Sequence, residues 1–228
     1  MPQTIERGLQ KALSGLFQML NCPALILMTR WPVKNRCKSR LAKDIGANKA
    51  ALIQERLNEH TFQVAKKLEE KNLVEIFIAI SGLSSENSKV WSRENGFKNI
   101  TSQGKGSLGV KMRRQLLGVQ VNNQTRSSII IGTDLPSLSA RDLNEGIELL
   151  KENQLVIGPS QDGGYWLIGL AGELLSPPAK WPFRDIPWGS NKVLSETLKL
   201  ALSKKIDYAL LQEKNDIDIL EDLDPWQL

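Results

Sequence analysis

Two aspartates stand where strand-like runs end, and their placement is the first indication of chemistry in this chain. Asp134 follows the apolar run 128–131 through Gly132-Thr133, and Asp162 follows the run 155–157 in a polar turn that continues into Gly163-Gly164. A single Asp-Gly-Gly turn is more often structural than functional, because paired glycines serve sharp turns. A second strand-end carboxylate in the same chain favours a site.

Carboxylates in this pattern suit a hard divalent cation. Asp134, Asp162 and Asp218 all lie past apolar segments, and Mg²⁺ or Mn²⁺ prefers such oxygen ligands together with substrate phosphates. We expect the ion to offset charge that builds on a phosphate leaving group. Nucleophilic-triad chemistry has little support, because the single histidine, His60, is expected on a helix away from every other candidate.

A basic cluster follows the first apolar run. Five cations fall within a short span: Arg30, Lys34, Arg36, Lys38 and Arg40. The formal net charge of the chain is +5, but many other basic residues alternate with acidic ones along helices, which is typical of solvated faces. Apart from Trp31, the cluster lacks the interleaved aromatic residues of single-strand nucleic-acid binding. We therefore interpret it as a site for a small anion such as a diphosphate, with no nucleic-acid partner.

The composition is that of a globular protein. Hydrophobic residues make up 41% of the chain and charged residues 24%, which is ordinary for soluble domains. No apolar run reaches membrane-spanning length and no secretory signal is apparent, so we expect no membrane insertion and a cytoplasmic location. Residues 1–22 are predicted to form an amphipathic helical extension, and residues 23–228 one domain. The oligomeric state stays open, a homodimer included.

Helical and strand-like segments alternate along the chain. Strands are expected near residues 24–28, 74–80, 97–101, 128–131, 155–157, 165–170 and 208–211, and helices near 47–71, 84–95, 107–120, 139–152 and 191–204. This alternation predicts an α/β sandwich with a mainly parallel sheet, in which ligands bind at the carboxyl ends of strands. Because Arg30, Asp134 and Asp162 each fall just past such an end, a shared pocket is expected there.

Several stretches resemble a bacterial family of glycosyltransferase-A-like proteins, DUF2064, some members of which are assigned to arsenosugar biosynthesis. Residues 30–41 are similar to its K-x-P-x-x-G-x-x-K-[TS]-R-L stretch, and residues 103–112 to Q-G-x-x-L-G-x-R-M. Residues 132–138 resemble G-x-D-x-P-x-L, and residues 158–169 resemble G-P-x-x-D-G-G-Y-x-L-I-G. Residues 183–188 and 216–223 complete the series, so the resemblance covers about 25–223 in order.

The resemblance implies a nucleotide-diphospho-sugar transferase fold, which is a Rossmann-like, three-layer α/β/α sandwich with a mainly parallel mixed sheet. It also implies roles for individual residues, which fall into four groups. Catalytic roles are implied for Asp134 and Asp162; nucleotide or diphosphate binding for Arg30, Lys38, Arg40, Gly104 and Asp134; sugar or acceptor binding for Pro136, Asp162, Gly163, Gly164 and Trp188; and binding of Mg²⁺ or Mn²⁺ for Asp134 and Asp218.

Three positions depart from the family's pattern. Arg30 replaces a lysine, Asn35 replaces a glycine, and Lys111 stands where arginine is common. The first and third substitutions keep the positive charge, and asparagine tolerates a left-handed backbone almost as well as glycine. These departures leave the donor preference open and do not argue against activity.

The expected reaction is transfer of a sugar from a nucleotide-diphospho-sugar donor to a small acceptor. An alternative is nucleotidyl transfer, in which a nucleoside triphosphate meets a phosphorylated small molecule and pyrophosphate leaves. This alternative follows from the stretch Lys38-Ser39-Arg40-Leu41, through which the family also resembles 2-phospholactate guanylyltransferases. A third interpretation is a nucleotide-binding protein without activity, against which the three aspartates argue.

Overall fold

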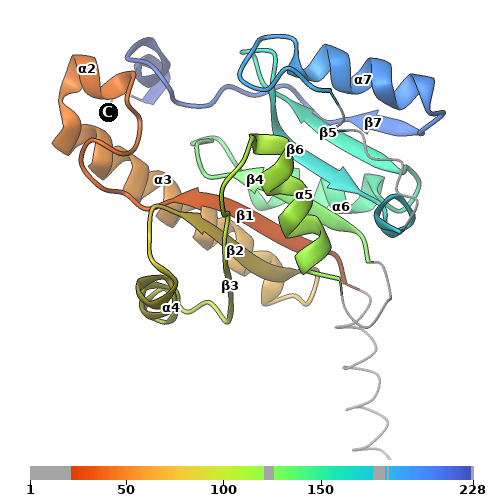
Figure 1. Cartoon of the computed structure of the whole chain (residues 1–228), viewed down its shortest axis with the longest axis horizontal. Coiled ribbons are helices and arrows are strands. Elements are labelled where there is room, and N and C mark those ends of the chain that lie inside the picture. The colour runs from red at the N-terminus through yellow and green to blue at the C-terminus, as the bar shows by residue number, and fades with distance from the viewer. Residues whose placement is uncertain (1–21, 121–125, 177–182, 184, 227–228) are drawn as a thin grey trace, which may run out of the picture.

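The computed structural model describes residues 22–120, 126–176, 183 and 185–226 (Figure 1). The predicted N-terminal extension, residues 1–22, lies almost entirely outside this range, so its helix is not described. Within the described ranges, no helix has the length and apolar character needed to cross a membrane.

The described residues build a mixed sheet of seven strands in the order β3-β2-β1-β4-β6-β5-β7. Every neighbouring pair is parallel except the two that involve β6. The strands are β1 (Ala24–Arg30), β2 (Glu75–Ser81), β3 (Asn99–Ser102), β4 (Ser128–Gly132), β5 (Leu155–Pro159), β6 (Tyr165–Leu170) and β7 (Tyr208–Leu210). The mainly parallel mixed sheet of the prediction is confirmed.

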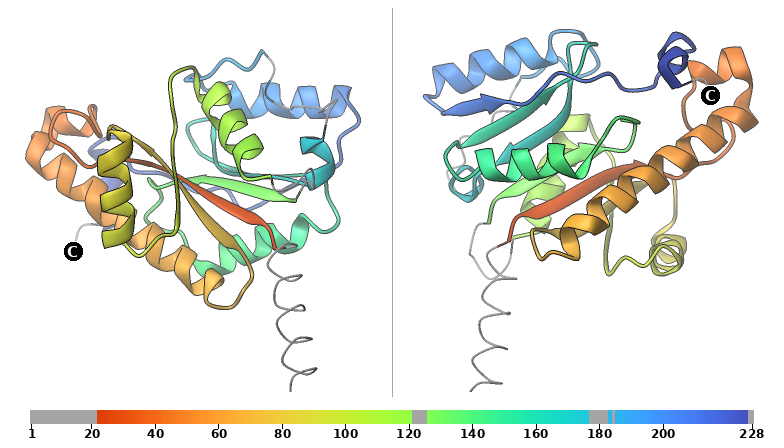
Figure 2. Two further views of the ribbon diagram at one scale, coloured as in Figure 1. Left: turned by 60° about the horizontal axis from the view of Figure 1, so that its bottom comes forward. Right: turned by 180° about the vertical axis from the view of Figure 1, so that it is seen from behind.

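Helices cover both faces of the sheet, which gives three layers. They are α2 (Leu41–Ile45), α3 (Ala47–Glu69), α4 (Ser85–Glu94), α5 (Leu108–Gly118), α6 (Ala140–Leu149) and α7 (Val193–Ser203), with 3-10 turns η1 (Gly172–Leu175) and η2 (Glu221–Trp226). Figure 1 shows α5 in front of the sheet, and the right view of Figure 2, from behind, shows α3 and α6 together on the opposite face. The predicted α/β/α sandwich is therefore confirmed.

Alternating side chains of β1 divide the core between these two faces. Leu25 and Leu27 belong to the core cluster that contains Phe62 of α3, whereas Ile26 belongs to the cluster that contains Leu116 of α5. A strand that pairs on both edges and is covered on both faces must be apolar throughout. This requirement explains the uninterrupted apolar run at the start of the domain.

Three helices are capped at their N-termini by serine side chains. The side chains of Ser84, Ser107 and Ser139 accept hydrogen bonds from backbone N–H groups in the first turns of α4, α5 and α6, which satisfies donors that have no intrahelical partner. Gly96, at φ +73°, follows the end of α4, just past the predicted helix near residues 84–95. The predicted boundaries of these helices agree with the structure to within about three residues.

The topology places the carboxyl ends of β1, β2, β4 and β5 at one edge of the sheet. The antiparallel partner β6 returns from that edge, so β5 and β6 form a hairpin. The C-terminal segment also crosses to this edge, where Ile217 packs with Leu41 and Leu57 in a small apolar cluster. Its backbone N–H donates to the carbonyl oxygen of Asp134 at 3.0 Å. Residues from both ends of the chain therefore meet beside β1 and β4.

Candidate active site

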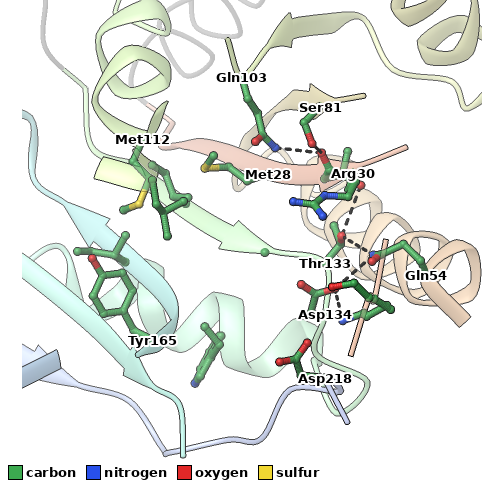
Figure 3. A pocket seen from close by; sticks show the side chains of 18 residues that line it. Met28, Arg30, Gln54, Ser81, Gln103, Met112, Thr133, Asp134, Tyr165 and Asp218 are labelled. Atoms are coloured by element: carbon green, nitrogen blue, oxygen red, sulfur yellow. Dashed lines mark hydrogen bonds and ion pairs between the residues drawn. The ribbon is translucent and has the colours of Figure 1, made fainter. Parts of the chain in front are cut away.

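A pocket of about 400 Å³ opens at the carboxyl edge of the sheet (Figure 3). Its polar end contains Arg30, Lys38, Asp134 and Asp218, and its apolar end is formed by Met28, Met112, Ile130 and Ile168. The ends of β1 and β4, helix α5 and the C-terminal segment all contribute side chains. A pocket with one charged and one apolar end suits a ligand that carries both an ionic and an uncharged part.

Lys38 and Asp134 form an ion pair within this pocket. The Nζ atom of Lys38 lies 2.5 Å from Oδ1 of Asp134, with exposed side-chain fractions of 5% and 46%. The same ammonium donates to the carbonyl oxygen of Ile217 at 2.5 Å. Lys38 has φ +47° and Asn35, in the same loop, has φ +63°, so the left-handed backbone expected at Asn35 is present. This loop turns the lysine inward, across the end of β4.

The Asp134 carboxylate has a second partner, which sequence reasoning missed. The side-chain amide of Gln54, on α3, donates to Oδ1 of Asp134 at 3.3 Å and to Oδ1 of Asn58 at 3.1 Å. Asn58 in turn accepts from the hydroxyl of Thr29, at 2.9 Å. The available signal was the pair of amides four residues apart on the buried face of a long helix. Gln54 and Lys38 therefore contact the same carboxylate oxygen of Asp134.

Asp218 is paired with Arg40 at the mouth of the pocket. The guanidinium lies 2.6 Å from Oδ2 of Asp218, and both side chains are substantially exposed. The carboxylate of Asp222 accepts from the backbone N–H groups of Asp218 and Ile219 at 2.7 and 2.8 Å. Burial alone would raise the pKa of Asp222, but these donors outweigh it and the pKa is lowered. The turn that presents Asp218 is therefore held by an ionised carboxylate.

Asp216 is a further acidic residue that sequence reasoning did not place in the site. It borders a smaller cavity of about 110 Å³ together with Asp134 and Tyr165. Burial raises the pKa of Asp216 to about 6, and repulsion from Asp162 and then Asp134 adds to this effect. The sequence signal was the alternation Asp216-Ile217-Asp218, which puts the two aspartates on the side of an extended segment opposite to a buried isoleucine.

The acidic side chains at the pocket could hold a divalent cation only together with oxygen atoms of a substrate or of water. Within the described residues, no group of three or more His, Cys, Asp or Glu side chains is arranged to hold a metal ion. Asp134 and Asp218 both line the pocket, and Asp216 borders the smaller cavity beside Asp134. Burial raises the pKa of Asp216 most, and repulsion from Asp162 and Asp134, which a cation would relieve, adds to it. Mg²⁺ is commonly bound by one or two carboxylates, with substrate phosphates and water completing its shell. The residues present fit such an ion.

The hairpin turn that contains Asp162 is held by local and packing contacts. Oδ1 of Asp162 accepts from the backbone N–H of Gly164 at 2.8 Å. Gly163 has φ +85°, and a Cβ atom there would overlap the carbonyl oxygen of Asn191. The carbonyl oxygen of Gly163 also accepts from the N–H of Leu194 at 2.9 Å. Close packing against the start of α7 thus accounts for the glycine at this position.

Several residues implied by the resemblance are placed outside the main pocket. Among the described residues that line it, Arg40, Gly104, Pro136, Asp162, Gly163, Gly164 and Trp188 do not occur. Gly104 lies under the guanidinium of Arg114, which also donates to the carbonyl oxygen of Gln103. Trp188 covers Gly109 and meets Tyr165 edge to face, with ring centroids 6.3 Å apart. Trp188 thus packs against Tyr165, which lines the pocket.

Gln103 is a buried residue that fixes the pocket floor. Its side-chain amide donates to the carbonyl oxygens of Thr29 and Ala79, at 3.0 and 2.9 Å. It thereby ties the segment after β3 to the ends of β1 and β2, as Figure 3 shows beside Ser81. His60, in contrast, contacts the carbonyl oxygen of Leu138 at 2.9 Å and takes no part in the pocket, as predicted.

The chain matches a known family of bacterial proteins. A family model described as an uncharacterized protein conserved in bacteria, DUF2064, matches residues 64–190, more than half of the 228 residues. The chain belongs to the DUF2064 family. This match includes Asp134 and the β5–β6 hairpin, whereas Lys38 and Asp218 lie outside it. No curated protein matches the chain.

Solved structures share the fold of this DUF2064 protein. A Desulfovibrio desulfuricans G20 protein assigned as a nucleotide-diphospho-sugar transferase is similar, with TM-score 0.77 and 21% identity over 86% of this chain and 82% of that one. A CMP:2-keto-3-deoxy-manno-octonic acid synthetase complexed with CTP has TM-score 0.54 and 10% identity, over 90% and 96% of the two chains. The Mycobacterium tuberculosis H37Rv protein Rv0371c, in complex with manganese, has TM-score 0.51 and 13% identity, over 89% and 95%.

These likenesses establish the fold. At identities of 10–21% they do not transfer an activity, because one fold hosts many functions. The expected family and the expected nucleotide-diphospho-sugar transferase fold are both confirmed.

Proposed function

We propose that this DUF2064 protein is a transferase that binds a nucleotide-diphospho-sugar and passes the sugar to a small acceptor. The observation that carries the proposal is the Lys38–Asp134 pair, which lies in a 400 Å³ pocket at the carboxyl edge of the sheet. Ligands of open α/β sheets bind at this edge. The likeness to a D. desulfuricans protein assigned as such a transferase supports the same reading.

Cations from the basic loop bind the diphosphate in this proposal. Lys38, which is almost fully buried, exchanges its contact with Asp134 for a phosphate oxygen, and Arg40 and Arg30 bind from the open side. Asp134 and Asp218 hold a divalent cation, which when bound supplies positive charge beside the leaving diphosphate. The manganese complex of Rv0371c supports a cation in this fold.

The acceptor enters from the side of the hairpin. An acceptor hydroxyl oxygen forms a bond to the anomeric carbon, and the bond between that carbon and the diphosphate oxygen breaks, so the nucleoside diphosphate leaves. Asp162 binds the hydroxyl and takes its proton, with Asp216 beside it. Gly163 and Gly164 shape the turn that presents Asp162, while the family resemblance assigns Pro136 and Trp188 to the acceptor.

Nucleotidyl transfer is the second candidate. The likeness to a CTP-bound CMP:2-keto-3-deoxy-manno-octonic acid synthetase favours it. In this reaction an oxygen of the small molecule forms a bond to the α-phosphorus of the nucleoside triphosphate, and pyrophosphate leaves. The same pocket serves both reactions, because each places a diphosphate group beside Lys38 and Asp134.

The two candidates are separated by the leaving group. Purified protein is incubated with Mn²⁺ and either nucleotide-sugars or nucleoside triphosphates, each with a mixture of phosphorylated and unphosphorylated small alcohols. Release of UDP or GDP from a nucleotide-sugar supports the proposal, and release of pyrophosphate supports the second candidate. Nucleotide binding without either product contradicts both and identifies a protein that only binds nucleotide. Asp134→Ala serves as the inactive control for either reaction.

A further inference from the structure

A second, smaller pocket adjoins the site and is built from cations. It has a volume of about 320 Å³ and is lined by Arg30, Trp31, Arg36, Ser81, Gly82 and Lys111. Arg30 and Ser81 also line the main pocket, and they are register partners at the ends of β1 and β2. The two pockets are therefore neighbours, with Arg30 at their common border.

The positive charges of this pocket are not paired with carboxylates in the described part of the chain. Among the described residues, none of Arg30, Arg36 and Lys111 forms an ion pair, and no carboxylate lines the pocket. Lys38 and Arg40, in contrast, are each paired with an aspartate. Three converging positive charges repel one another unless an anion lies between them. The pocket thus holds uncompensated positive charge next to a site that is internally neutralised.

The cations are positioned by separate elements, so they do not form one mobile surface patch. The Nη1 atom of Arg30 donates to the carbonyl oxygen of Arg36 at 3.1 Å, which ties the end of β1 to the basic loop. Lys111 comes from the first turns of α5 and is half-buried. Trp31 also lines the pocket and meets Trp91 edge to face, at 5.9 Å between ring centroids. This frame presents guanidinium and ammonium donors to one small volume.

We propose that this pocket, bounded by Arg30, Arg36 and Lys111, is a second oxyanion subsite that binds a phosphate-type group separate from the diphosphate held by Lys38. The subsite extends the proposed function. It rests on that function only for the identity of the molecule that carries the phosphate-type group. The group is either the third phosphate of a nucleoside triphosphate or a phosphate on the acceptor. Arginine and lysine donors suit both, because phosphate oxygens accept several charge-assisted hydrogen bonds at once.

Binding of inorganic phosphate to the full chain tests the subsite without nucleotide or turnover. In calorimetric titrations, Lys111→Gln and Arg36→Gln are each expected to weaken phosphate binding at least roughly fivefold, and Lys111→Arg to restore it. Lys89→Gln removes an exposed lysine of α4 and is expected to leave phosphate binding unchanged. Unfolding temperatures measured without ligand confirm that the variants are folded.

Nucleotides then identify the source of the anion. If Lys111→Gln weakens the binding of a nucleoside triphosphate but not of the diphosphate, and inorganic phosphate competes only with the triphosphate, the subsite binds the third phosphate. If phosphate binds together with either nucleotide, the subsite receives the acceptor's phosphate. Both results support the subsite. If phosphate binds in a Lys111-dependent way but no nucleotide binds, the subsite is supported and the proposed function is refuted. Wild-type phosphate affinity in Lys111→Gln and Arg36→Gln, or an equal loss of diphosphate affinity, overturns it.

Discussion

Two turns at the same edge of the sheet each carry an aspartate, yet the structure uses them differently. Asp134 is contacted by residues far away in sequence, Lys38 at 2.5 Å and Gln54 at 3.3 Å. Asp162 accepts its hydrogen bond from Gly164, only two residues on. Similar sequence positions therefore give one carboxylate that is built into a pocket and one that helps to shape its own turn. The difference supports the proposed binding role of the turn after β4, whereas the contacts of the hairpin turn are those of a packing element.

The largest expected effect tests the packing role of the hairpin turn. Gly163→Ala places a Cβ against the backbone of Asn191 at a φ of +85°, so we expect a loss of about 3 kcal/mol in the free energy of unfolding. Gly189→Ala is the matched control, because Gly189 has φ +84° but no atom within 4 Å of its added Cβ. That control should lose only about 1 kcal/mol. Urea denaturation measures both, and equal losses would show that backbone conformation alone explains Gly163.

The next effect concerns the turn that carries Asp134. Lys38→Met removes the ammonium that contacts Asp134 and Ile217, and we expect affinity for a nucleoside diphosphate to fall about tenfold. Stability should change less, because Asp134 is 46% exposed and water can solvate its carboxylate. Lys151→Met, which breaks an exposed helical pair with Glu148, should leave the affinity unchanged. Equal affinity in wild-type protein and Lys38→Met would remove Lys38 from the phosphate site.

The smallest effect comes from Asp216, which lies near both turns. Burial and the carboxylates of Asp162 and Asp134 raise its pKa to about 6, above the ordinary value of about 3.9. The folded protein therefore holds this proton more tightly, and the free energy of unfolding falls as pH rises from about 4 to above 6. Asp216→Asn removes this loss. With EDTA present, the variant should gain on the order of 1 kcal/mol over wild type at about pH 8 and nothing at about pH 4. The same difference at both pH values would contradict the raised pKa.

Much of the fold could be predicted because the elements are locally specified. The apolar run of β1, the serine caps of α4, α5 and α6, and the glycine after α4 are each legible in a few consecutive residues. The edge at which Asp134 and Lys38 would meet followed from the parallel topology. Asn35 likewise has the left-handed backbone expected where relatives carry glycine.

The contacts that hold the site residues in place could not be predicted, because they join side chains that are far apart in the sequence. Gln54 reaches Asp134 from a helix 80 residues earlier in the chain, and only its buried position separates it from an ordinary polar helix residue. Asp216 gains its raised pKa from burial and from neighbours on other segments. The unpaired state of Lys111 is equally a property of the assembled pocket, since charge along the sequence does not show which cations find partners.

The most direct test of the account compares the two aspartates in one binding measurement. Titration of a nucleoside diphosphate in the presence of Mn²⁺ is carried out with wild-type protein, Asp134→Ala and Asp162→Ala. We expect Asp134→Ala to lose nucleotide affinity by at least about tenfold to a hundredfold, the range that even outer-shell metal partners contribute. Asp162→Ala should stay within about threefold of wild type, because the proposal assigns its carboxylate to the acceptor. Wild-type affinity in Asp134→Ala, or an equal loss in both variants, would contradict the assignment of Asp134 to the diphosphate and its cation.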